Sequence, residues 1–139
     1  MAVASASAFV GVTPELADQV ASLTAGEKVR VNVILWAQHD PHRMRDELSP
    51  LRGRTLRAAL WKDVEQRVAD TQAPVRLVVD ELVARGDATE PRVLYSANGL
   101  NLWLTAAGVH ALAGRPEIRS LDWDEDRPVE EVIDAVVSP

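Results

Sequence analysis

RVLYSANGLNLWLT, residues 92–105, contains the clearest structural signal in the sequence. Two runs of strand-forming residues, 92–97 and 100–104, flank the pair Asn98-Gly99. Asn-Gly is typical of tight hairpins, because both central positions of the favoured turn have a positive φ. We therefore predict an antiparallel β-hairpin that turns at Asn98 and Gly99.

Two further strands are predicted outside the hairpin. In residues 29–36 every second side chain is apolar, which is typical of a strand with one face in a core. The other face of that strand carries Arg30, Asn32, Ile34 and Trp36. Residues 118–123 predict the last strand, and Thr105 is expected to cap a short helix that precedes it.

A long helix is predicted for residues 54–85, where apolar side chains recur with helical spacing up to Gly86. Pro74 predicts a kink or a break in it, because proline lacks an amide donor and clashes with the preceding turn. With a rise of about 1.5 Å per residue, this helix is much longer than the strands. Its first half is therefore expected to extend beyond the sheet and to pack on a short helix that begins at Thr13-Pro14. Residues 37–53 are polar and interrupted by prolines, which predicts a loop.

Together these elements predict an α+β protein of the ferredoxin-like βαββαβ type. That fold is a four-stranded antiparallel sheet with two helices on one face, and its other face is open. An N-terminal helix and a C-terminal tail are added to it. We expect a flexible arm over residues 1–12, one α+β domain over residues 13–126, and a tail over residues 127–139.

Composition limits the class of function. The chain has 139 residues, 47% of them hydrophobic and 26% charged, which fits one globular domain. Its formal net charge of −6 argues against nucleic acid and against anionic membranes as partners. There is no cysteine, and therefore neither a disulfide nor a thiolate metal site. Because the N-terminus has no signal-peptide pattern, we expect a cytoplasmic protein, unless the chain is excised from a secreted precursor.

The order and spacing of several motifs between Glu27 and Val129 resemble the propeptides and stand-alone inhibitors of subtilisin-like serine proteases. The motifs are Tyr95-Ser-Ala-Asn-Gly-Leu100, Leu102-Trp-Leu-Thr105, Val109-His-Ala-Leu112, Arg115-Pro-Glu-Ile118, Leu121-Asp-Trp-Asp124 and Arg127-Pro-Val129. The helix that contains Thr71-Gln72-Ala73-Pro74 is similar to the long first helix of the larger family members. One feature departs from the family, whose tail is extended: residues 128–137 have helical spacing.

The resemblance implies a function without catalysis. Members of that family inhibit the protease or act as its intramolecular chaperone, with the open sheet face on two surface helices of the protease. The segment after the last strand lies in the substrate cleft. We therefore expect a protease inhibitor, either supplied as a separate protein or excised as a propeptide that assists the folding of its own protease. The chain offers no Asp/His/Ser set, so we expect no enzyme activity. We also expect no cofactor and no metal.

Four apolar side chains on the open face are expected to dock on the protease: Ile34, Trp36, Leu94 and Trp103. The strands that carry Trp36 and Trp103 are expected to lie side by side in mid-sheet, so the four side chains should form one apolar patch with tryptophan as its anchor. In the alternative interpretation, the long helix or the tail covers this face.

Acidic residues and the tail complete the site that the resemblance implies. Carboxylates are expected to cap the N-termini of the two protease helices, where they would meet unpaired amide donors: Asp122, Asp124, Glu125 and Asp126. A solvated acidic loop is the alternative. The residues expected in the cleft, as an added strand, are Arg127, Pro128, Val129, Glu130, Glu131, Val132 and Ile133. A C-terminal helix that begins at Pro128 fits the sequence equally well.

Other functions fit parts of the sequence. The main alternative is a ferredoxin-like regulatory module that binds a small molecule or dimerises through its sheet. An acylphosphatase-type enzyme is disfavoured, because the residues after Trp36 contain no glycine nest for a phosphate. His39, Asp40 and His42 lack a further well-spaced ligand, so a metal site is not expected there.

Overall fold

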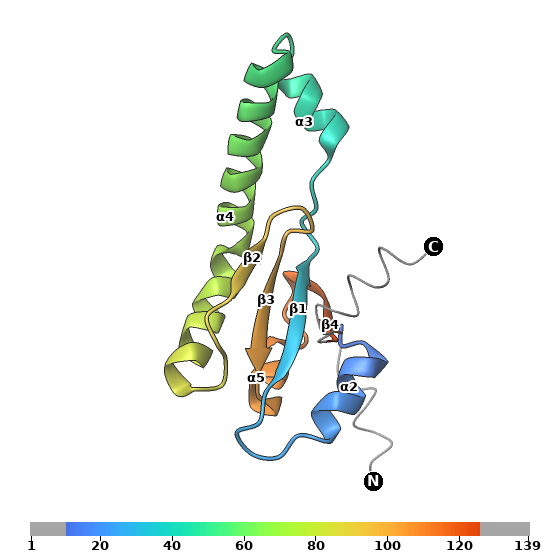
Figure 1. Cartoon of the computed structure of the whole chain (residues 1–139), viewed down its shortest axis with the longest axis vertical. Helices are drawn as coiled ribbons and strands as arrows, with labels where there is room; N and C mark the ends of the chain where they lie inside the picture. Colours follow the sequence, from blue (N-terminus) through green and yellow to red (C-terminus); the bar gives the residue numbers. More distant parts are fainter. Residues whose placement is uncertain (1–10, 126–139) are drawn as a thin grey trace, which may run out of the picture.

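The computed structural model describes residues 11–125 and shows an α+β protein, as the sequence predicts (Figure 1). A four-stranded antiparallel sheet packs against helices, and one long helix extends well beyond the sheet. Within the described residues, no helix is both long and apolar enough to cross a membrane. The elements in chain order are α2 (Pro14–Ala21), β1 (Val29–Leu35), α3 (Pro41–Glu47), α4 (Gly53–Arg85), β2 (Arg92–Leu94), β3 (Gly99–Leu104), α5 (Ala106–Leu112) and β4 (Ile118–Trp123).

The sheet has the strand order β2-β3-β1-β4. β1 pairs antiparallel with β3 on one side and with β4 on the other, so that Val31 lies opposite both Leu102 and Trp123. α4 lies between β1 and β2 in the chain, and α5 lies between β3 and β4. Each of these two connections therefore passes over one intervening strand. Where the register between β1 and β4 shifts, Arg119 is the extra residue of β4.

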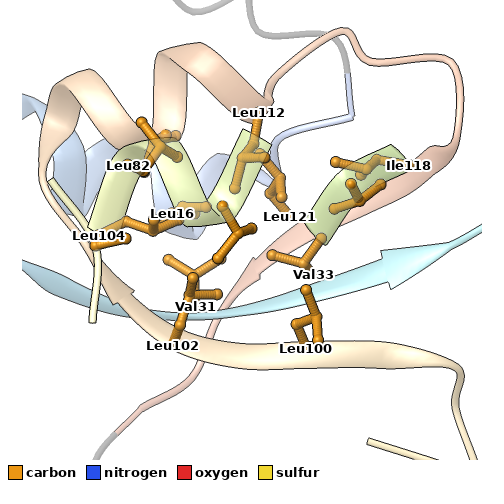
Figure 2. Packing of buried hydrophobic residues seen from close by; sticks show 14 of the residues in the cluster. Leu16, Val31, Val33, Leu82, Leu100, Leu102, Leu104, Leu112, Ile118 and Leu121 are labelled. Carbon is orange, nitrogen blue, oxygen red and sulfur yellow. The ribbon is translucent and has the colours of Figure 1, made fainter. Parts of the chain in front are cut away.

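Alternate side chains of the strands form one core beneath three helices. In Figure 2, Val31 and Val33 of β1 lie in one cluster with Leu16 of α2, Leu82 of α4 and Leu112 of α5. All five are almost inaccessible to solvent. Burial of one large aliphatic side chain stabilises a fold by about 1.5–3 kcal/mol. The N-terminal helix α2 therefore packs on the same face of the sheet as α4 and α5.

The long helix α4 is continuous from Gly53 to Arg85, so the predicted break at Pro74 is wrong. Pro74 is exposed, and the carbonyl group that loses its amide partner can therefore be hydrated. The neighbouring Gln72 and Val75 are buried and hold the helix against the sheet at this point. Gly86, with a φ of 83°, ends the helix in the left-handed conformation that the sequence predicts for it.

Residues 37–53 are not a continuous loop, because they contain the helix α3. Asp40 caps this helix by accepting a hydrogen bond from Arg43 N (3.2 Å), and Pro41 occupies the first turn. α3 lies beside the part of α4 that extends beyond the sheet (Figure 1), and Glu47 forms an ion pair with Arg67 across the two helices (3.2 Å). The prediction that this part of α4 packs on α2 is therefore wrong. α2 instead contributes Leu16 to the core between the sheet and the helices.

The β2–β3 hairpin is present, but its turn differs from the predicted one. Only Asn98 has a positive φ (44°), whereas Gly99 is already the first residue of β3. Gly99 is needed for a different reason: a Cβ there would lie 2.3 Å from the carbonyl oxygen of Val33 in the adjacent strand. The absence of a side chain thus permits β1 and β3 to approach closely at this point.

A buried polar cluster, formed by Thr71, Gln72 and Asn98, fastens this turn to α4. Gln72 Nε2 donates to Asn98 Oδ1 (3.1 Å) and to the carbonyl oxygen of Gly99 (3.0 Å). Asn98 Nδ2 donates to Thr71 Oγ1 (2.9 Å) and to the carbonyl oxygen of Ala37. Gln72 and Asn98 are almost fully buried, so each depends on the other for hydrogen bonds that water cannot replace. We call these three residues the turn cluster.

Residues before α2 pair with the outer edge of β4. Leu121 N donates to the carbonyl oxygen of Gly11 (2.7 Å), and Thr13 N donates to the carbonyl oxygen of Leu121 (3.1 Å). Val12 thereby forms a parallel bridge with Leu121. Of the predicted flexible arm over residues 1–12, the last two residues therefore contact the edge of β4, and residues 1–10 lie outside the described part of the chain.

Candidate functional site: the open face of the sheet

The open face is the sheet surface opposite the core, and it is formed by every second residue of the strands. Its side chains come from Arg30, Asn32 and Ile34 of β1, Arg92 and Leu94 of β2, Asn101 and Trp103 of β3, and Ser120 and Asp122 of β4. Strand pairing arranges them in rows. The middle row is polar in all four strands and runs from Arg92 through Asn101 and Asn32 to Asp122.

A hydrogen-bonded network occupies this face at its centre. Arg30 Nε donates to Asn101 Oδ1 (3.2 Å) and forms an ion pair with Asp124 Oδ2 (3.0 Å). Asn101 Nδ2 donates to Asn32 Oδ1 (2.7 Å) and to Asp124 Oδ2 (2.8 Å). Arg30, Asn32, Asn101 and Asp124 are called the open-face network below. Asn101 lies at its centre, because it bonds to all three other members.

The open-face network fixes the positions of its side chains but contributes little to the stability of the fold. The side chains of Arg30 and Asp124 are 31% and 29% exposed, and a partly solvated ion pair contributes only about 0–1 kcal/mol. The same exposure leaves the polar atoms accessible to a partner. Their mutual hydrogen bonds hold the side chains in one arrangement, which reduces the entropy that binding would otherwise cost.

The apolar residues predicted to dock do not form one patch. Trp103 lies opposite Arg30 at one end of the open face and is 39% exposed. Ile34 lies at the other end, near Leu94, and is buried. Trp36 follows the end of β1 and is 64% exposed. The strands that carry the two tryptophans are neighbours in mid-sheet, as predicted. The single apolar patch is not formed, because the polar middle row separates Trp103 from Ile34 and Trp36.

The structure places three of the four predicted capping acids on or beside this face. Asp122 is half-buried in the middle row and accepts a hydrogen bond from Ser120 Oγ (3.4 Å). Asp124 belongs to the open-face network, so its carboxylate already has two partners within the chain. Glu125 is exposed. Asp126 lies outside the described residues.

The predicted tail also lies outside the described residues, which end at Glu125. This applies to every residue expected in the cleft, from Arg127 to Ile133. What the structure does give is the starting point of the tail. Asp124 N donates to the carbonyl oxygen of Arg30 (2.9 Å), so the chain leaves β4 at the end of the sheet where Trp103 is located.

His39, which follows β1, has a structural contact. His39 Nε2 is 2.8 Å from the carbonyl oxygen of Tyr95, so this nitrogen is protonated and donates to the β2–β3 turn. Within residues 11–125, no group of three or more His, Cys, Asp or Glu side chains is placed to hold a metal ion.

Sequence reasoning missed the central members of the open-face network. Arg30 and Asn32 were assigned to the correct face of β1, but Asn101 was not identified as a site residue. The available signal was its position in phase with Trp103 in β3, which puts both on the open face. No family model, no curated protein and no solved structure matches this chain.

Proposed function

We propose that this protein is an inhibitor of a subtilisin-like serine protease and that the same contact assists the folding of that protease. The open face of the sheet docks on the protease surface, and the tail after Glu125 occupies the substrate cleft. The observation that carries the proposal is the position of this exit. The chain leaves β4 beside Arg30 and Trp103, so a partner seated on the open face is directly within reach of the tail.

The ferredoxin-like fold is part of this proposal. The strand order β2-β3-β1-β4, with α3 and α4 in the first crossover connection and α5 in the second, supports that arrangement. Because α2, α4 and α5 all pack on one face, the other face is left for a partner.

The contact would combine one apolar anchor with polar groups held in place. Trp103, partly exposed at the rim of the open-face network, is the residue best placed to enter a pocket of the protease. Asp122 is the best-placed helix-capping acid, because its only hydrogen bond to a described side chain is the long one from Ser120 (3.4 Å). Asp124 would first have to give up Arg30 and Asn101.

The proposal predicts stoichiometric inhibition. A subtilisin-like protease encoded next to the gene for this chain should lose its peptidase activity when the two proteins are mixed in equal amounts, because substrate and tail compete for one cleft. Activity is measured with a small chromogenic peptide, and binding is measured separately by calorimetry. Full protease activity at roughly tenfold molar excess of this protein would refute the proposal, since a tight complex is saturated there.

Removal of residues 127–139 serves as the matched control for that experiment. The shortened chain keeps the sheet and should still bind, but it should no longer compete with the peptide. If the shortened chain inhibits as well as the full chain, the sheet itself blocks the cleft and the assigned role of the tail is wrong. If the full chain self-associates through its sheet and ignores the protease, the regulatory-module alternative replaces the proposal.

Trp103→Ala should weaken the complex by about 2 kcal/mol, which is typical for an aromatic anchor at an interface. It should change the melting temperature of the free protein only slightly, because the side chain is already 39% exposed. Leu77→Ala is the control, since Leu77 is 69% exposed on α4 and does not belong to the open face. Equal effects of the two substitutions on affinity would show that Trp103 is not in the interface.

A further inference from the structure

A pocket lies away from the open face, where α3, the first half of α4 and the β2–β3 turn meet. It has a volume of about 510 Å³, which is in the range of small-molecule pockets. Most of its wall is apolar or aromatic, with Leu60, Trp61 and Val64 from α4 and Tyr95 from the turn. None of the residues of the open-face network lines it, so any ligand it takes is independent of the proposed protease contact.

The walls of this pocket are held in place by contacts within the chain. The rings of Trp61 and Tyr95 lie 5.2 Å apart at an angle of 54°, which joins α4 to the turn. His39 bonds to the carbonyl oxygen of Tyr95 (2.8 Å). Gln38 Nε2 donates to the carbonyl oxygens of Leu35 and Ala97, both at 2.7 Å. A pocket with walls fixed in this way does not need to be formed by its ligand.

Among the residues that line the pocket, Arg45 carries the only formal charge. Its lining contains His39, His42 and Arg45 but no acidic residue, although the whole chain has a net charge of −6. His42 and Arg45 are three residues apart on α3 and therefore share one side of that helix. Within residues 11–125, Arg45 is exposed and forms no ion pair, whereas Glu47 on the same helix pairs with Arg43 and Arg67. The pocket thus combines an apolar wall with a guanidinium that lacks an ionic partner in the described chain.

We propose that this pocket binds a small amphipathic carboxylate, such as a medium-chain fatty acid. The carboxylate pairs with Arg45, and His42 lies close enough on the same helix side to assist. The apolar chain lies along Trp61, Leu60 and Val64. Arg45 favours this ligand class over a neutral one, because its planar guanidinium presents paired donors to a carboxylate. The aromatic pair favours it over a small inorganic anion, which would leave the apolar wall in contact with water.

Decanoate, used below its micelle concentration, is a direct probe. Calorimetric titration of the full chain should show saturable binding of one decanoate, and the tryptophan fluorescence should change with the same dissociation constant because Trp61 lines the pocket. Arg45→Gln should weaken binding roughly tenfold or more, the value of one charge-assisted hydrogen bond. Arg43→Gln removes the same charge from the same helix outside the pocket, and it should leave the affinity nearly unchanged.

Two further measurements make the outcome decisive. Val64→Trp fills the pocket and should abolish binding while the far-ultraviolet circular dichroism stays native. Decanol, which has the apolar chain without the charge, should bind much more weakly than decanoate. Absence of saturable binding, equal losses for Arg45→Gln and Arg43→Gln, or equal affinities for decanol and decanoate would each overturn the proposal. If Val64→Trp does not fold, the comparison of the two arginine variants still decides between the outcomes.

Discussion

Gly99→Ala should lower the free energy of unfolding by about 3 kcal/mol or more. The added methyl group would lie 2.3 Å from the carbonyl oxygen of Val33 and 3.1 Å from Cδ1 of Ile34. Relief of this contact requires β1 and β3 to separate at the start of β3, where Ile34 and Gly99 are paired. Urea denaturation followed by circular dichroism measures the loss.

Gly26→Ala is the matched control for this prediction. Gly26 has a φ of 87°, and no atom lies within 4 Å of a Cβ built there. The same substitution should therefore cost only the conformational strain of about 1–2 kcal/mol. If Gly99→Ala is no more destabilising than Gly26→Ala, the close approach of β1 and β3 at Gly99 is not a feature of the folded protein.

Asn98→Ala is expected to destabilise the fold by about 3 kcal/mol. It removes the donor to Thr71 and Ala37 and the acceptor for Gln72, and a buried group left without its partner costs about 1–3 kcal/mol. Alanine also tolerates the positive φ at this position less well than asparagine does. Thermal and urea unfolding of the variant measure the combined loss.

A double-mutant cycle tests whether the turn cluster acts as a unit. Gln72→Ala together with Asn98→Ala should cost less than the two single changes added together, with a coupling of about 1–2 kcal/mol. Ser96→Ala, in the same turn but exposed, should change stability by less than about 0.5 kcal/mol. Additive effects of the two buried substitutions would mean that Gln72 and Asn98 do not depend on each other.

Sequence signals predicted the ends of helices correctly where a single residue determines the local backbone conformation. Gly86 ends α4 in the left-handed conformation, and Thr105 accepts a hydrogen bond from Gly108 N (3.1 Å) at the start of α5. The alternation in β1 correctly separated its core residues from its open-face residues. α3 was missed although Asp40-Pro41 is a capping acid followed by a first-turn proline. The segment is polar and interrupted by prolines, and these features predicted a loop instead.

The candidate site was less predictable, because it depends on contacts between strands. Arg30, Asn101 and Asp124 meet only because β3 and β4 pair with β1 in one particular register. A shift of one residue would turn Asn101 to the other face, and no local pattern excludes that shift. The break at Pro74 was predicted from a local rule that tertiary contacts overrode, since buried residues on both sides of Pro74 hold α4 against the sheet and the helix continues through it.

The segment Gly11–Thr13 has a consequence for how this protein behaves in a crowded solution. An outermost strand with free backbone groups is a template on which identical chains can stack into fibrils. Here one border of the sheet is occupied by the protein's own backbone through Leu121, and the strand at the opposite border, β2, has only three residues. Docking through the open face would leave both borders unchanged. The molecule can therefore bind a partner through a broad sheet surface. At the same time it has few unpaired backbone groups at the borders of the sheet to which a second copy could add.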